Sequence, residues 1–87
     1  MSDKVDLLYF AWVRERIGRD AERVSLPEDV RDVAGLLDWL EARDEGYTAA
    51  LHERGRLRVA VNQQFARLDD PVRPGDEIAI FPPVTGG

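Results

Sequence analysis

The sequence predicts one α+β domain, a roll in which a single main helix packs across a sheet of short strands. A length of 87 residues is that of one domain, and a composition of 44% hydrophobic and 33% charged residues is typical of a folded chain. The spacing of the apolar residues predicts the order strand, strand, helix, strand, short elements, strand. No internal repeat, linker or low-complexity segment interrupts this order.

The first two predicted strands, at 5–10 and 22–26, form a hairpin; the first is apolar on both faces, and the second alternates in hydrophobicity. Between them, residues 11–17 favour a short helical turn, and Gly18 supplies the left-handed conformation that ends it. One face of the first strand belongs to the core, and the sequence leaves open whether a helix or loop covers the other. The two faces carry Val5, Leu7 and Tyr9, and Leu8 and Phe10, respectively.

The main helix is predicted after Pro27, which ends the second strand. Asp29 is the expected N-cap, and the negative charge of Asp32 in the first turn suits the helix dipole. The apolar residues that follow have helical spacing, which predicts a helix with one buried face that ends near Arg43. They are Val30, Val33, Leu36, Leu37 and Leu40, with Trp39 beside them.

Two later strands are predicted at 57–61 and 77–81. The ranges 69–71 and 73–76 are turn signals rich in aspartate and proline, and Val72 between them is a lone apolar plug. Pro82 cannot donate a ladder hydrogen bond, so the last strand ends there. The expected inward residues are Leu57, Val59, Val61, Ile78 and Ile80, and the outward ones are Arg58, Ala60, Ala79 and Phe81.

The composition argues against several classes of function. A formal net charge of −5 repels phosphate backbones, so no nucleic-acid binding is expected. The absence of cysteine removes disulfides, thiolate metal sites and cysteine nucleophiles, and His52 has no second ligand at metal spacing. No apolar run approaches the roughly 20 residues needed to span a bilayer, and the N-terminus has no apolar signal segment. We therefore expect a cytoplasmic protein without metal or membrane contact.

The segment 82–87 is predicted to be an extended functional tail on a domain formed by residues 1–81. Pro82 and Pro83 give it a stiff base, and Gly86 and Gly87 give it a tip without side chains, able to enter a narrow channel. The one reactive group at this tip is the α-carboxylate of Gly87, which must be activated before it can react. In a chain without cysteine, a sulfur cargo has to sit on this carboxylate. A frayed, functionless Gly-Gly end is the alternative.

Three stretches of the sequence form a recognisable set: the first runs from Leu8-Tyr9-Phe10-Ala11 to Ile17-Gly18, the second is 59–63 (Val-Ala-Val-Asn-Gln), and the third is 75–87. Together they resemble the small subunit of molybdopterin synthase. The ending Pro-Pro-Val-Thr-Gly-Gly is the most specific part, whereas residues 44–55 add little. This resemblance implies a ubiquitin-like β-grasp fold with a flexible Gly-Gly tail.

The resemblance also implies a chemistry and a set of partners. An E1-like adenylating enzyme uses ATP and magnesium to adenylate Gly87, and sulfur from a cysteine desulfurase system replaces AMP to leave a thiocarboxylate. The tail then enters the large subunit, in a heterotetramer of two small and two large subunits. There the sulfur passes to cyclic pyranopterin monophosphate and builds the dithiolene of molybdopterin. On this view the chain binds no cofactor stably, and the catalytic side chains belong to the large subunit.

The family grips its partners through an apolar surface beside the tail. The residues of this chain that match it are Phe10, Phe65 and Phe81, with Arg14 as a charged contact and with Pro82, Pro83, Val84 and Thr85 in the tail itself. Three alternatives remain open: a sulfur carrier for thiazole and thiamin synthesis, a ubiquitin-like modifier joined to other proteins by isopeptide bonds, and a pure binding module.

Overall fold

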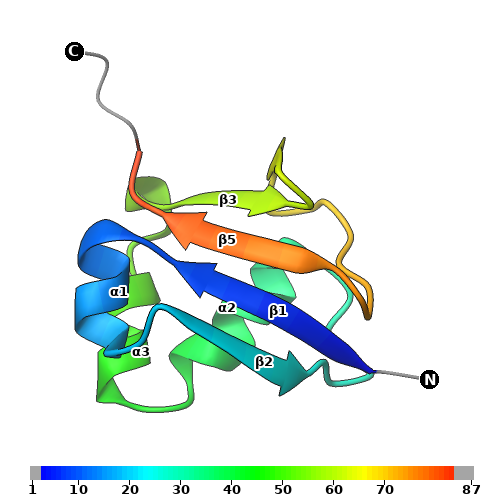
Figure 1. The fold of residues 1–87 in the computed structure, drawn as a ribbon, viewed down its shortest axis with the longest axis horizontal. Coiled ribbons are helices and arrows are strands. Elements are labelled where there is room, and N and C mark those ends of the chain that lie inside the picture. Colours follow the sequence, from blue (N-terminus) through cyan, green and yellow to red (C-terminus); the bar gives the residue numbers. More distant parts are fainter. Residues whose placement is uncertain (1–2, 84–87) are drawn as a thin grey trace.

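The computed structural model describes residues 3–83 of the chain. They form one mixed five-stranded sheet; in the view of Figure 1 α2 crosses behind it, and α1 and α3 lie at the left, where β1 ends and β2 begins. The predicted α+β roll is therefore confirmed. The elements in chain order are β1 (Lys4–Tyr9), α1 (Ala11–Ile17), β2 (Ala21–Ser25), α2 (Val33–Glu41), α3 (Glu45–Leu51), a short 3₁₀ helix η1 (Arg54–Arg56), β3 (Arg58–Val61), β4 (Gln64–Ala66) and β5 (Glu77–Phe81).

The strand order across the sheet is β2-β1-β5-β3-β4, so the first and last strands of the chain lie side by side at its centre. β1 runs parallel to β5 and antiparallel to β2, while β3 is antiparallel to both of its neighbours. In the parallel pair Tyr9 lies opposite Ile80, so both strands end at the same edge of the sheet. The chain consequently leaves β5 at the edge of the sheet where β1 also ends, as Figure 1 shows.

The core lies between the sheet and the helices. The predicted inward residues of β1, β3 and β5 are nearly all buried, as is the plug residue Val72, at 4% exposure. The helical stripe of α2 is buried as predicted. Apolar burial on this scale is the main favourable term for a domain this small. The side chains at or below 1% exposure are Val5, Leu7, Tyr9, Val13, Val33, Leu36, Leu37, Leu40, Leu51, Ile78 and Ile80.

The N-cap of the main helix was predicted at the wrong aspartate. The N-cap of α2 is Asp32, not Asp29: its backbone is extended, and its Oδ1 accepts a hydrogen bond from Gly35 N at 2.8 Å. Residues 27–30 form a turn instead, closed by the bond from Val30 N to Pro27 O. Asp29 and Asp32 are equally good caps in the sequence. The choice is made by a tertiary contact, the β-bridge between Asp32 and Pro71.

Three elements were not predicted: α3, the 3₁₀ helix η1 and β4. α3 begins at the N-cap Asp44, whose carboxylate accepts from Tyr47 N at 3.1 Å, and it buries three residues at helical spacing. Gly46 lets α3 approach α1, because a Cβ there would lie 2.7 Å from the carbonyl oxygen of Arg16. β4 has only three residues, too few for a clear alternating pattern.

Glu22 forms a polar cluster that ties β2 to β1 and to the helices. Its carboxylate, only 7% exposed, accepts hydrogen bonds from the hydroxyls of Tyr9 at 2.7 Å and Tyr47 at 2.6 Å and from Arg19 and Arg43, each at 3.2 Å. Burial raises the pKa of both tyrosines, that of Tyr47 to about 12, and the bond to Glu22 adds to the rise. Burial opposes ionisation of Glu22, but the bonds from Tyr47, Tyr9 and Arg43 outweigh it and lower its pKa.

Candidate functional site

The face of the sheet opposite the helices carries an apolar surface next to the root of the C-terminal segment. The register places Phe10 and Phe81 side by side where β1 and β5 end. Phe10 is 46% exposed and Phe65 is 80% exposed, and no helix of the described residues covers this face (Figure 1). The sequence left open whether this face of the sheet is covered, and the structure shows that it is exposed. A cluster of exposed aromatic side chains is typical of a protein-binding surface.

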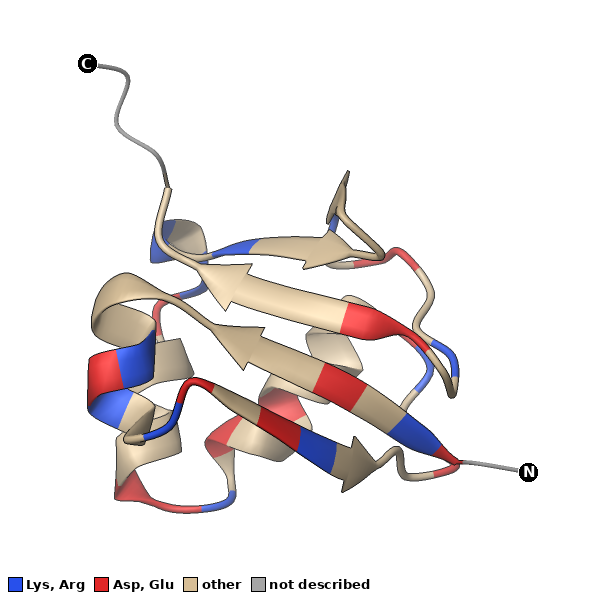
Figure 2. Cartoon of the chain, in the orientation of Figure 1, with Lys and Arg blue, Asp and Glu red and all other residues tan. Residues whose placement is uncertain are grey.

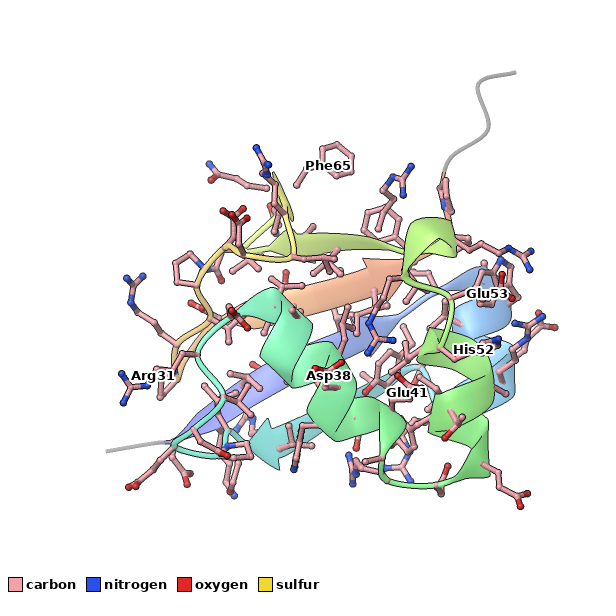
Figure 3. All side chains as sticks on the ribbon, turned by 180° about the vertical axis from the view of Figure 1, so that it is seen from behind. Arg31, Asp38, Glu41, His52, Glu53 and Phe65 are labelled. Atoms are coloured by element: carbon pink, nitrogen blue, oxygen red, sulfur yellow. The ribbon has the colours of Figure 1, made fainter. Side chains whose placement is uncertain are left out.

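Phe65 and Phe81 meet across the sheet. Their ring centroids are 6.1 Å apart with the planes tilted by 48°, a geometry favourable to aromatic pairs. With Pro83 and Arg58 they line a surface hollow of about 410 Å³. In Figure 3 the Phe65 ring stands clear of the body of the molecule. The hollow therefore begins at the point where the C-terminal segment leaves the sheet.

The floor between the aromatic side chains is made of small or aliphatic residues in register. Phe65 lies opposite Ala60, Ala60 opposite Ala79, and Ala79 opposite Leu8. All three neighbours of Phe65 in this row are partly buried rather than fully exposed. Flat alanines flanked by aromatic rings leave room for side chains of a docking protein.

Phe10 is held by a tight reversal between β1 and α1. It is the extended N-cap of α1, and its N–H donates to the carbonyl oxygen of Ile80 at 3.2 Å. Ala11 then adopts the left-handed conformation at φ 54°, which a residue with a Cβ rarely does. α1 ends as predicted at Gly18, at φ 91°. These constraints fix the direction in which the Phe10 ring leaves the sheet.

The charged residues near the tail include one that the sequence analysis did not select. Arg14 is exposed on α1 and makes no ion pair within the described range 3–83, so its predicted contact stays a prediction. Arg58 lies opposite Phe81 in the register and lines the hollow. The sequence pattern could have identified Arg58, because Arg58 is an outward residue of a strand whose inward residues are apolar. Figure 2 shows the acidic residues of β5 and β1 toward the strand starts, away from the tail.

The predicted reactive residues Gly86 and Gly87 and the predicted partner contacts Val84 and Thr85 lie outside the described residues, so their roles stay predictions. Pro82 and Pro83 follow β5 and are partly buried. Within residues 3–83 there is no cluster of side chains suited to hold a metal ion. No helix in that range is long and apolar enough to cross a membrane.

Three features define the class of ubiquitin-like β-grasp proteins. They are a mixed sheet whose first and last strands are parallel, a helix across one face, and an exposed apolar surface where the last strand ends. Comparison with known families narrows this class: residues 7–87 match the ThiS family. The chain belongs to the ThiS family.

Relatives of known name support this assignment over the full length. The chain is 43% identical over 83 residues to the molybdopterin synthase sulfur carrier subunit of Escherichia coli, covering 95% of this chain and 99% of the relative. It is 34% identical to the subunit of the same name from Homo sapiens, with 97% and 94% covered. Among solved structures, the small archaeal modifier protein 1 of Haloferax volcanii superposes with a TM-score of 0.72 at 30% identity, covering 93% and 98%.

Proposed function

We infer that this chain is the sulfur-carrier subunit of a molybdopterin synthase. The observation that carries the inference is the 43% identity to a protein of that name across nearly the whole of both chains. The exposed apolar surface at the root of the tail supports it, because a carrier must dock before it can deliver its cargo. In this function the chain supplies the sulfur atom and another subunit supplies the catalytic side chains.

The chemistry follows from the one reactive group at the C-terminus. An ionised carboxylate is a poor electrophile, so the Gly87 carboxylate attacks the α-phosphate of ATP, releases pyrophosphate and becomes an acyl-adenylate. A persulfide of the sulfur source then attacks the acyl carbon and displaces AMP, and a thiol reductant cleaves the resulting acyl disulfide to leave a thiocarboxylate. Magnesium and ATP belong to the activating enzyme, in which Mg²⁺ neutralises the phosphates. The thiocarboxylate donates its sulfur to cyclic pyranopterin monophosphate, and two such transfers complete the dithiolene.

The proposed partners are the large subunit of the synthase, an E1-like adenylating enzyme and a sulfur source fed by a cysteine desulfurase. The apolar surface formed by Phe10, Phe65 and Phe81 lies beside the tail, so a partner that holds it can receive the tail at the same time. We propose a heterotetramer of two small and two large subunits, working in the cytoplasm. The large subunit is the partner that acts on the pterin.

The test is a reconstitution with the large subunit, activating enzyme and sulfur source of the same organism. With ATP present, mass spectrometry of the intact chain should show one oxygen replaced by sulfur at Gly87, and the product should form molybdopterin from the pterin substrate. Deletion of Gly87 should abolish both reactions without changing the unfolding temperature. An unmodified terminus in the complete mixture would refute the inference. A sulfur-loaded chain that supports only thiazole formation would favour the thiamin pathway instead.

A ubiquitin-like modifier is the second candidate. It is favoured by the likeness to small archaeal modifier protein 1, at a TM-score of 0.72. The two functions share an activated C-terminal glycine and differ in the nucleophile, which is sulfur for a carrier and a lysine amine for a modifier. Lysine residues of cellular proteins that carry the C-terminal peptide of this chain would support the modifier. If no such lysine adducts are found in cells that make an active molybdenum enzyme, only the sulfur-carrier function remains.

A further inference from the structure

The free edge of the sheet at β4 is arranged to pair with a strand from outside. The turn between β3 and β4 has two residues, Asn62 and Gln63, both at positive φ (52° and 69°), which is the geometry of a type I′ hairpin. In such a hairpin the flanking pair, Val61 and Gln64, is hydrogen-bonded, and the next pair is not. The backbone N–H and C=O of Phe65 therefore point away from β3, toward the outer edge.

This open stretch is one residue wide. Beyond β4 the edge is closed, because Arg67 N donates to Asp70 Oδ2 at 2.8 Å and Arg67 O accepts from Asp70 N at 3.1 Å. Within residues 3–83, nothing bonds to the backbone groups of Phe65. An edge strand with unpaired groups is a template for a partner strand, and natural proteins usually close it. Here it is closed except at the residue whose ring is 80% exposed.

A hollow lies on each side of this edge. The hollow of about 410 Å³ on the open face contains the Phe65 and Phe81 rings. A second, of about 250 Å³, lies on the helix side; Val33 and Leu37 of α2 form part of its apolar lining, and Arg54 and Arg67 add charged groups. Arg58, Val59 and Ala66 line both. Successive side chains of an added strand point to opposite faces, so neighbouring residues of that strand would enter the two hollows.

The positive charges at the β4 edge favour the binding of an anionic group. Continuing the hairpin register by one residue places Arg67 opposite Arg58, and like charges in that position repel. Arg58 donates to the carbonyl oxygen of Leu57 at 2.9 Å and has no carboxylate within 4 Å in the described part of the chain. Among residues 3–83 the Arg67 guanidinium has only Asp69 as an ion-pair partner, at 3.7 Å, and both side chains are more than 80% exposed. A carboxylate from a partner would relieve this repulsion.

We propose that the molybdopterin synthase large subunit adds a short extended segment to β4, with an acidic residue next to Arg58 and Arg67. The segment makes two backbone hydrogen bonds to Phe65 and places alternate apolar side chains in the two hollows. The proposal rests on the function proposed above, since it concerns the protein that receives the tail. This pairing would bring Phe65, which lies on the edge strand, into the contact that the large subunit makes where the C-terminal segment leaves the sheet.

The first test follows the Phe65 amide by hydrogen exchange in the free chain and in its complex with the large subunit. In the free chain this amide should exchange rapidly, and in the complex it should slow by about tenfold or more. An amide that stays unprotected in a saturated complex would overturn the proposal while leaving the proposed function intact. Failure of the wild-type chain to bind the large subunit would count against both.

The second test compares Phe65→Ala with Phe65→Pro in binding to the large subunit. Both remove the ring, but only proline removes the N–H, and proline is tolerated on an edge strand whose N–H faces outward. The proline variant should bind about fivefold more weakly than the alanine variant, the effect of one net hydrogen bond. Equal dissociation constants for the two variants, with matched unfolding midpoints, would overturn the backbone pairing.

The acidic contact is tested separately by Arg67→Glu, with Arg73→Glu as the control. Arg73 is exposed in the turn before β5, away from the edge, and gives the same change in net charge. Arg67→Glu should weaken binding about fivefold, with a smaller effect at high salt, whereas the control should leave the dissociation constant unchanged. Equal effects of the two variants would rule out a specific carboxylate at this edge.

Discussion

Glu22 offers a quantitative test of how the polar cluster stabilises the domain. Its carboxylate accepts four hydrogen bonds, two from tyrosine hydroxyls and two from arginines. Glu22→Gln keeps the shape and one acceptor oxygen but removes the other acceptor oxygen and the negative charge that pairs with both arginines. Since a hydrogen bond to a charged group contributes about 1.5–3 kcal/mol and the arginines are partly exposed, we expect a loss of about 2 kcal/mol at pH 7. For a domain of this size that lowers Tm by on the order of 10 °C.

The effect must depend on pH in a defined direction. Because the folded state lowers the pKa of Glu22, its ionised form is stabilised by folding. This contribution is fully present above the unfolded pKa, about 4.3, and is lost as the pH falls through the lower, folded value. The difference in free energy of unfolding between wild type and Glu22→Gln should be constant between pH 7 and about pH 5. It should shrink at lower pH as Glu22 becomes protonated.

Urea unfolding followed by circular dichroism at pH 7, 5 and 3 measures this difference. Glu28→Gln is the matched control, because Glu28 is exposed and makes no ion pair in the described range of residues. The control should stay within about 0.5 kcal/mol of wild type. A difference for Glu22→Gln that does not change between pH 7 and pH 3 would refute the electrostatic account. It would point to packing alone.

Three further outcomes are expected. Gly46→Ala should destabilise the domain by about 1–3 kcal/mol, because its Cβ would lie 2.7 Å from a backbone oxygen of α1, while Gly55→Ala, with nothing within 4 Å, should be nearly neutral in thermal unfolding. Ala11→Val should lower the free energy of unfolding by roughly 1 kcal/mol and Ala11→Gly should not, because residue 11 has φ 54°. Equal urea midpoints for the two variants would contradict this. Phe81→Ala should weaken large-subunit binding by about tenfold or more in calorimetry, with an unchanged fold by circular dichroism; wild-type affinity would remove Phe81 from the interface.

The two phenylalanines at the centre of the sheet show what the sequence could predict about the site. Alternation alone assigned Phe10 and Phe81 to the face opposite the core, and the resemblance to a known family added Phe65. The sequence could not decide whether that face was covered, because an apolar second face is equally suited to a packed helix and to a docking partner. Exposure of Phe10 and Phe65 is a property of the helix arrangement, which leaves no helix of residues 3–83 over this face of the sheet.

Local signals determined β1, β2, β3 and β5, the turn at Gly18 and the buried stripe of α2, because these depend on periodicity and on backbone preferences of single residues. Tertiary structure decided the rest. The bridge from Asp32 to Pro71 selected one of two equivalent caps, and the parallel pairing of β1 with β5 brought Phe10 and Phe81 together across some 70 residues of sequence. Such contacts depend on which distant segments meet, and no local pattern encodes that. The same pairing sets the place where the chain's C-terminal segment leaves the domain.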